Sequence, residues 1–210
     1  MDNKKELLKY IDMCQASWTN ETSMDYILMN GGQGDTFEFR ETDVQGFWLE
    51  NKNNIYIVFR STENKFSEWL ENFNFFPSND GFHRGVSNKI NELVYGYFRK
   101  LLCFKYKNIY FIGHSLGGCI ARQLGIEFST NKNNYYVVTF GSYCTTQKKW
   151  LRFDDSNTKN YMITSDASNL FTKFLRIFGY KDKYIYLKKK GFWSMENHDI
   201  KVYREVIENA

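Results

Sequence analysis

One stretch decides the fold of this chain: Ile109-Tyr110-Phe111-Ile112-Gly113-His114-Ser115-Leu116-Gly117-Gly118. An apolar, β-rich run leads into a glycine-rich turn, and residues 119–128 continue in a pattern compatible with a helix. The stretch therefore predicts a strand, a tight turn and a helix, with Ser115 at the apex. Gly113 and Gly117 would let the strand and the helix approach closely, so that the Ser115 hydroxyl points out of the fold. The helix N-terminus beneath it favours developing negative charge.

We interpret this turn as a nucleophile elbow, in which the apex serine is held in a strained, sparsely populated backbone conformation. A bare Gly-x-Ser-x-Gly pattern also arises by chance, and the alternative is an ordinary glycine-rich turn. The flanking strand and helix favour the elbow.

Strands alternate with helices along the rest of the chain, which indicates an α/β fold with a mostly parallel central sheet flanked by helices. We expect helices at 4–16, 82–102, 116–128 and 199–208. We expect two short strands within 36–50, around a turn at 43–45, and further strands at 54–60, 108–112, 135–140, 161–164 and 184–187. Sites in such sheets form beyond the carboxyl ends of the strands, where Ser115, residues 60–62 and residues 165–166 all lie.

Composition narrows the class of protein. The 210 residues fit a single domain spanning 1–210, and an aromatic content of 19% lets Phe and Tyr build much of its core. No apolar run approaches twenty residues, and residues 1–6 lack the apolar core of a signal peptide, so we expect a cytoplasmic or intracellular protein without a transmembrane span. A net charge of +4 is short of a nucleic-acid footprint. The cysteines have no CxxC spacing, which argues against a zinc site and fits reduced thiols: Cys14, Cys103, Cys119 and Cys144.

A serine hydroxyl needs a base to take its proton, and the base is usually histidine. The chain has three histidines. His114 is adjacent to Ser115, and adjacent side chains on such a turn point apart, so we expect it to pack under the elbow. His83 opens the predicted helix at 82–102. In the chain order serine, aspartate, histidine that α/β-hydrolases use, His198 is the candidate base.

The orienting carboxylate should follow a strand between Ser115 and His198. Asp166 fits best, because the strand at 161–164 leads directly into it, and a carboxylate there could stabilise the imidazolium formed during attack. Asp154 and Asp155 are competitors in a loop. The alternative role for Asp166 is to cap a strand end.

An oxyanion hole needs two backbone N–H groups aimed at the developing charge. One should come from Leu116, directly after the nucleophile. The second should come from a loop after an earlier strand, where Thr62 is the candidate and its hydroxyl is a possible extra donor.

Together these motifs resemble the class 3 (fungal-type) lipase family. The matching pieces occur in the family's order over roughly residues 10–205: Ile57-Val58-Phe59-Arg60-Ser61-Thr62, Phe82-His83-Arg84-Gly85-Val86, Gly113-His114-Ser115-Leu116-Gly117-Gly118, Val138-Thr139-Phe140-Gly141 and Ile163-Thr164-Ser165-Asp166. The resemblance implies an α/β-hydrolase fold and a serine esterase acting on acyl esters. It also implies a Ser115, Asp166 and His198 triad, with Thr62 and Leu116 in the oxyanion hole.

The chain departs from the family pattern in three places. Ser61 stands where the family usually has glycine, and residues 141–144 read Gly-Ser-Tyr-Cys where it often has Gly-x-Pro-Arg. Residues 193–197 look like the family's C-terminal histidine segment with Trp193 in the histidine position. Residues 198–203 offer a second register with the same histidine-to-tyrosine spacing. We prefer the second register because it leaves a working base at His198; the first would describe a non-catalytic relative.

Two further segments relate to lipid. Residues 63–77 resemble the family's lid, a short amphipathic helix over the site, with Phe66, Trp69, Leu70 and Phe73 at helical spacing. The alternative is a fixed helix that packs these side chains in the core. Residues 170–191 hold seven Lys or Arg and one acid among aromatic residues. They could attract anionic lipid headgroups, but we favour a strand and a turn with solvated lysines.

The leading hypothesis is therefore a serine acyl-ester hydrolase, a lipase or phospholipase A1-like enzyme that works through an acyl-enzyme. We expect no metal or organic cofactor, a lipid or small ester substrate, possible peripheral contact with a membrane or lipid surface, and no nucleic-acid partner. The alternatives are a catalytically inactive binding or scaffold protein on the same fold, and an acyltransferase using the same triad.

Overall fold

A computed structural model describes residues 3–61, 82–102, 108–129, 134–143, 146, 157–177, 179–180 and 182–210. Its described part contains a seven-stranded sheet in the order β1-β2-β3-β4-β5-β6-β7. The strands are β1 Gln33–Phe39, β2 Val44–Asn51, β3 Asn54–Phe59, β4 Asn108–His114, β5 Asn134–Phe140, β6 Thr158–Ile163 and β7 Ile185–Leu187.

The sheet is mostly parallel, as predicted. β1, β2 and β3 pair antiparallel, and every pair from β3 to β7 is parallel. β3, β4 and β5 are nearly continuous apolar runs, which is the composition of parallel strands buried on both faces. The carboxyl ends of β3 to β6 therefore lie along one edge of the sheet.

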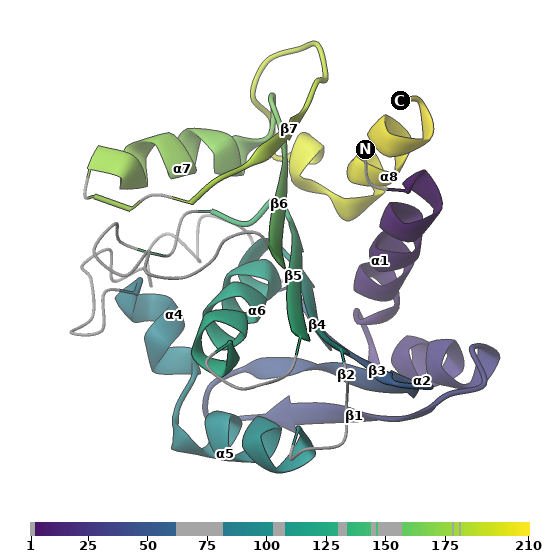
Figure 1. Cartoon of the computed structure of the whole chain (residues 1–210). Coiled ribbons are helices and arrows are strands. Elements are labelled where there is room, and N and C mark those ends of the chain that lie inside the picture. Colours follow the sequence, from purple (N-terminus) through teal and green to yellow (C-terminus); the bar gives the residue numbers. More distant parts are fainter. Residues whose placement is uncertain are drawn as a thin grey trace.

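Helices cover both faces of this sheet (Figure 1). They are α1 Lys4–Ala16, α2 Asn20–Met29, α4 Arg84–Lys89, α5 Glu92–Leu101, α6 Ser115–Phe128, α7 Ala167–Ile177 and α8 Ile200–Glu208, with a short 3-10 helix η3 at Glu196–His198. The helices α4 to α7 lie on one face, and α1, α2 and α8 lie on the other. None of the helices in the described ranges is both long and apolar enough to cross a membrane.

The two faces of the sheet bury separate apolar clusters, because side chains alternate along each strand. On β4, Ile109 and Phe111 face the α4–α7 side, whereas Ile112 faces the α1 and α8 side. Aromatic residues fill both clusters, as composition predicts. Phe98 of α5 packs edge-on against Phe37 at a ring-centroid distance of 5.2 Å.

Three helical features differ from the sequence prediction. Helix α2 was not predicted; a capping box at Thr19 and Thr22 starts it, although it buries only Ser23 and Ile27. The helix expected over 82–102 is two helices, because the backbone leaves the helical conformation at Ile90 and Asn91 caps a new start by accepting from the Val94 N–H. The basic stretch, for which a strand and a turn were preferred, begins as helix α7 and has only the three-residue strand β7.

Candidate active site

Ser115 lies at the junction of β4 and α6, as the elbow requires. Its φ of +53° falls in the left-handed region that non-glycine residues rarely adopt. A Cβ on Gly113 would collide with the Gly117 backbone, and a Cβ on Gly117 would collide with the carbonyl of Phe59. The glycines therefore let helix α6 start directly against the ends of β3 and β4, which forces the tight turn at Ser115.

His198 lies beside Ser115, 83 residues further along the chain. Its Nε2 atom is 2.7 Å from Ser115 Oγ, and its Nδ1 atom is 3.0 Å and 3.1 Å from the two carboxylate oxygens of Asp166. All three distances are within hydrogen-bond range, so the three side chains form a continuous hydroxyl–imidazole–carboxylate chain. In this geometry Nδ1–H donates to Asp166, which leaves Nε2 as the acceptor for the Ser115 hydroxyl.

Asp166 is fully buried at the end of β6 and has other donors besides His198. The Tyr203 hydroxyl donates to Oδ2 at 2.5 Å, and the backbone N–H and hydroxyl of Ser168 donate to Oδ1, each at 2.7 Å. Burial alone would raise the pKa of the Asp166 carboxyl, but the nearby imidazole and the hydrogen-bond donors outweigh it and hold the pKa below its ordinary value. Asp166 is thus an anion that can stabilise positive charge on His198.

His114 supports His198 from below the elbow. Its Nε2 atom is 2.6 Å from the His198 carbonyl oxygen, and the two ring centroids are 4.8 Å apart. A carbonyl accepts only, so His114 Nε2–H is the donor. Burial, reinforced by the neighbouring His198, lowers the pKa of His114 to about 3. His114 is therefore neutral at physiological pH and does not compete for the Asp166 charge.

Gly141, at the end of β5, lies directly against Asp166 and His198. Its φ is +61°, and a Cβ there would lie 3.1 Å from Asp166 Oδ2 and from His198 Nδ1. Any side chain at this position would press on the hydrogen bond between the two residues. The departure from the family pattern after Gly141 leaves this close approach intact.

The structure separates the two registers proposed for the C-terminal histidine. Trp193 is half-exposed, and its Nε1–H donates to the Thr164 carbonyl at 3.1 Å. His198 is the residue that reaches Ser115. The third histidine, His83, is buried between Tyr143 and Tyr180, with ring centroids 5.7 Å from each.

Several predicted site residues lie outside the described part of the chain. These are the oxyanion candidate Thr62, the lid residues Phe66, Trp69, Leu70 and Phe73, and the competing acids Asp154 and Asp155. Leu116, the other oxyanion candidate, is described: it follows Ser115 in the first turn of α6, and its side chain is buried in the core.

Sequence reasoning missed the partners of Asp166. The spacing between His198 and Tyr203 matches the family's, but it does not point to Asp166, and Ser168, two residues beyond the acid, carries no motif. The available signal was the apolar spacing of helix α8, which puts Ile200, Tyr203 and Ile207 on its buried face. A tyrosine on a buried face requires a hydrogen-bond partner, and here that partner is Asp166.

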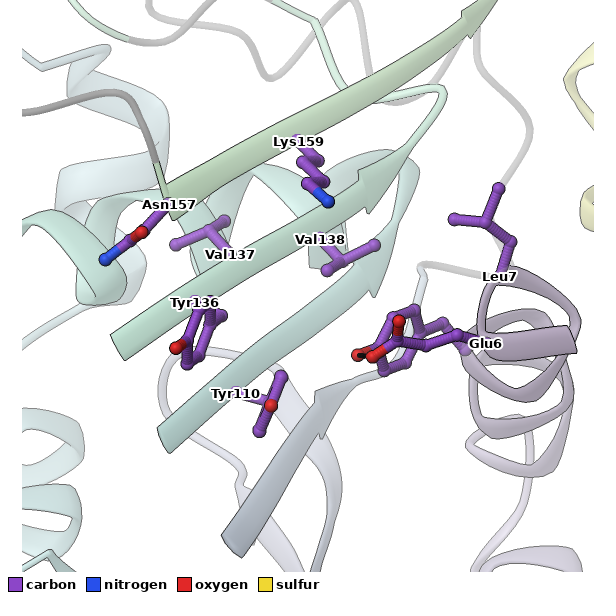
Figure 2. Close-up of a pocket in the computed structure, with 9 residues that line it drawn as sticks. Glu6, Leu7, Tyr110, Tyr136, Val137, Val138, Asn157 and Lys159 are labelled. Atoms are coloured by element: carbon purple, nitrogen blue, oxygen red, sulfur yellow. Dashed lines mark hydrogen bonds between the residues drawn. The ribbon is translucent and has the colours of Figure 1, made fainter. Parts of the chain in front are cut away.

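A separate hollow of about 220 Å³ lies away from these residues, against the α1 face of the sheet (Figure 2). It is lined by Glu6 and Tyr10 of α1 and by Tyr110, Tyr136 and Lys159 of the strands. Tyr110 stacks on Tyr136 at 4.8 Å between centroids. Tyr110 is four strand residues before His114, so this hollow is about 13 Å along β4 from the elbow.

Among the described residues, no group of three His, Cys, Asp or Glu side chains is placed to hold a metal ion.

Comparisons with known proteins agree on the family and the fold. The family model described as "Lipase (class 3)" matches residues 56–167. No curated protein matches the sequence.

Solved lipase structures are similar across most of the chain. The triacylglyceride lipase of Rhizomucor miehei superimposes with a TM-score of 0.70 at 15% identity, covering 89% of this chain and 81% of that one. Lipase II from Rhizopus niveus superimposes with a TM-score of 0.67 at 20% identity, covering 91% of this chain and 82% of that one. The mono- and diacylglycerol lipase of Aspergillus oryzae superimposes with a TM-score of 0.69 at 18% identity, covering 86% of this chain and 77% of that one.

At these identities the structural matches show the fold, which is that of the α/β-hydrolases. The family match confirms the resemblance inferred from the motifs. Because that match spans more than half of the chain, this protein belongs to the class 3 lipase family.

Proposed function

We propose that this chain hydrolyses lipid esters through an acyl-enzyme formed on Ser115, with His198 as the base and Asp166 as its orienting anion. The observation that carries the proposal is the unbroken sequence of contacts from Ser115 Oγ to His198 Nε2 and from His198 Nδ1 to Asp166. A base in contact with a serine at a strained elbow is what activates an otherwise weak nucleophile.

The reaction follows from these contacts in two halves. His198 Nε2 takes the Ser115 proton as Oγ bonds to the ester carbonyl carbon, and Asp166 stabilises the imidazolium that forms. Collapse of the tetrahedral adduct breaks the bond to the leaving alkoxide, which takes the proton from His198 and departs as the alcohol. Water then attacks the acyl-enzyme, giving its proton to His198, and the collapse that releases the fatty acid returns that proton to Ser115.

The negative charge on the tetrahedral oxygen needs donors at its own position. We assign them to the N–H groups of Leu116 and Thr62. Leu116 stands in the first turn of α6, where N–H groups have no partner within the helix. The tight contact between Gly117 and the carbonyls of Phe59 and Arg60 supports the role of Thr62, because it holds the end of β3 against the elbow two residues before Thr62.

Acylglycerols are the first substrates to test, because structural neighbours are described as triacylglyceride and mono- and diacylglycerol lipases. Phospholipids cleaved in the manner of a phospholipase A1 are the second class. Both are presented at a lipid surface, so the proposed function includes peripheral contact with that surface.

The test is hydrolysis of p-nitrophenyl esters of short and long acyl chains, followed by emulsified triacylglycerol and phosphatidylcholine. Ser115→Ala and His198→Ala should each lower kcat/KM by a factor of about 10⁴ or more. Ser129→Ala, the same change at the far end of α6, is the matched control and should act like wild type. Wild-type turnover no higher than that of Ser115→Ala, with a lipid interface present, would refute the enzyme and leave a binding protein on a lipase fold.

A further inference from the structure

Helix α7 is apolar on two sides. Phe171 and Leu175 are buried in the core beneath it, as in an ordinary surface helix. The opposite side carries Leu170, Phe174 and Ile177, which are 47%, 45% and 79% exposed. These three recur at i, i+4 and i+7, so they form one outward stripe that the described part of the chain leaves in solvent.

A second exposed apolar strip lies next to this stripe in the segment 185–195. Phe192 is 95% exposed, and Trp193 is 50% exposed. The Lys173 ammonium of α7 lies 4.7 Å above the Trp193 ring, which places the segment against the outer side of the helix. We refer to the outward stripe of α7 together with residues 185–195 as the α7–Trp193 surface.

The α7–Trp193 surface is also strongly basic. Five exposed cations lie on these two segments or directly before the second one: Lys173 and Arg176 on α7, Lys188 and Lys190 within 185–195, and Lys183 two residues before it. The sequence from 167 to 195 contains one acid, Asp182, whose side chain is fully buried and paired with Arg122 at 2.9 Å. Exposed aromatic and aliphatic groups beside exposed lysines, on a segment whose one acid is buried, match a membrane–water interface that carries negative headgroups.

This surface adjoins the candidate active site. The Ser194 N–H donates to the Ser165 carbonyl at 3.0 Å, and the Ala167 N–H donates to the Ser194 carbonyl at 3.3 Å. These two bonds form a parallel bridge between Asp166 and Ser194, so the Trp193 strip runs beside the residue that precedes α7. A bilayer seated on this surface would lie beside the end of the sheet that holds Ser115 and His198.

We propose that the α7–Trp193 surface docks this protein on anionic phospholipid bilayers. The lysines supply attraction to the headgroups, and Phe192, Trp193 and the α7 stripe insert at the acyl boundary. The inference deepens the proposed function and rests on it, because docking matters only for a chain that acts on lipid. The surface as defined includes none of residues 63–77, the segment that resembles the family's lid.

Vesicle flotation tests the proposal on the Ser115→Ala protein, which leaves the lipid intact. The Ser115→Ala protein with an otherwise unchanged surface should bind vesicles of phosphatidylcholine with 30% phosphatidylserine at least about tenfold more tightly than vesicles of phosphatidylcholine alone. The triple change Lys183→Glu, Lys188→Glu and Lys190→Glu should remove at least about tenfold of that affinity. The matched control is Lys5→Glu, Lys52→Glu and Lys100→Glu, which changes the net charge equally at exposed sites on α1, the β2–β3 turn and α5.

Phe192→Ala tests the apolar part, with Met29→Ala, an exposed apolar residue on α2, as its control. We expect loss of binding from Phe192→Ala and no change from Met29→Ala. Binding that ignores phosphatidylserine, or an equal loss from both charge triples, would overturn the docking proposal. Self-association that the Lys triple abolishes, with no vesicle binding, would assign the surface to a second copy instead. Hydrolysis of a water-soluble short-chain ester by protein with intact Ser115 is scored separately, so docking and catalysis can fail independently.

Discussion

Two buried carboxylates in this molecule have opposite surroundings. Asp182 is paired with Arg122 at 2.9 Å, and both side chains are sealed, with 0% and 1% exposed. Asp166 is paired with His198 at 3.0 Å, and it is equally buried, but the His198 side chain is 12% exposed. One partner is a permanent cation, whereas the other gains and loses a proton.

The difference separates a charge that holds the fold from a charge that can do chemistry. Arg122 on α6 joins the segment after α7 to the core and has no exposed face through which to act. The Nε2 atom of His198 contacts the Ser115 hydroxyl, so the imidazole can take up and release a proton there while Asp166 fixes the orientation of the ring. A buried acid is thus a candidate for catalysis when its partner is titratable and reaches outward, and burial alone does not qualify it.

Replacing Asp166 by Asn should give the largest effect on activity. The amide can donate to Nδ1, which favours the tautomer that carries its proton on Nε2, and an Nε2–H cannot accept from Ser115. We expect kcat for ester hydrolysis to fall by a factor of about 10⁴. The steady-state rate of hydrolysis of a short-chain ester measures the change. Asp182→Asn should leave kcat within a few-fold of wild type; an equal loss in both variants would remove the distinction between the two acids.

Replacing Arg122 by Met should instead act on stability. It leaves Asp182 buried without its cation, which costs about 3–5 kcal/mol of unfolding free energy. Urea unfolding measures the loss. The double variant Arg122→Met, Asp182→Leu should be more stable than the single variant, because neither charge remains in the core. A double variant as unstable as the sum of its two single changes would show that the pair is not coupled.

Acid should destabilise the chain through its buried histidines. Burial lowers the pKa of His83 and of His114 to about 3 from the ordinary 6.5. Below pH 6.5 the unfolded chain binds protons at these positions and the native chain does not, so stability is complete above pH 6.5 and falls as pH drops toward 3. Well below pH 6.5 each histidine contributes about 1.4 kcal/mol per pH unit. In urea titrations at pH 7, 6 and 5, His83→Phe, which keeps an aromatic ring against Tyr143, should reduce the loss of stability by roughly this amount between pH 6 and 5, and by about half of it between pH 7 and 6.

Replacing Tyr203 by Phe should give the smallest effect and sharpen the role of the acid's surroundings. The change removes one donor from Asp166, so the carboxylate holds His198 less firmly. We expect kcat to fall about tenfold with KM unchanged, which corresponds to about 1.4 kcal/mol. Tyr136→Phe on β5 is the matched control and should leave kcat alone. A rise in KM with constant kcat would show that Tyr203 shapes substrate binding and does not position the acid.

The local patterns predicted the fold well where one short stretch specifies a structure. Gly113, Ser115 and Gly117 predicted the elbow because only small residues permit that turn, and alternation of strands with helices predicted the mostly parallel sheet. Three histidines and a chain order were enough to propose His198. The structure places it in contact with Ser115, although its catalytic role stays a prediction.

The sequence failed where contacts between distant segments decide the structure. The bond from Tyr203 to Asp166 joins residues 37 apart, and no spacing rule links them. The pairing of Arg122 with Asp182 is equally non-local. The break between α4 and α5 was missed for a local reason, since Asn91 is a good N-cap but stands within an unbroken amphipathic pattern.

The left-handed backbone at Ser115 has an evolutionary consequence. A φ of +53° costs a serine about 1 kcal/mol or more that a glycine would not lose, so the fold would tolerate glycine there at least as well. Selection for heat resistance alone would then draw position 115 toward glycine and silence ester turnover. A serine at this strained position is what selection for turnover, in preference to durability, would leave behind.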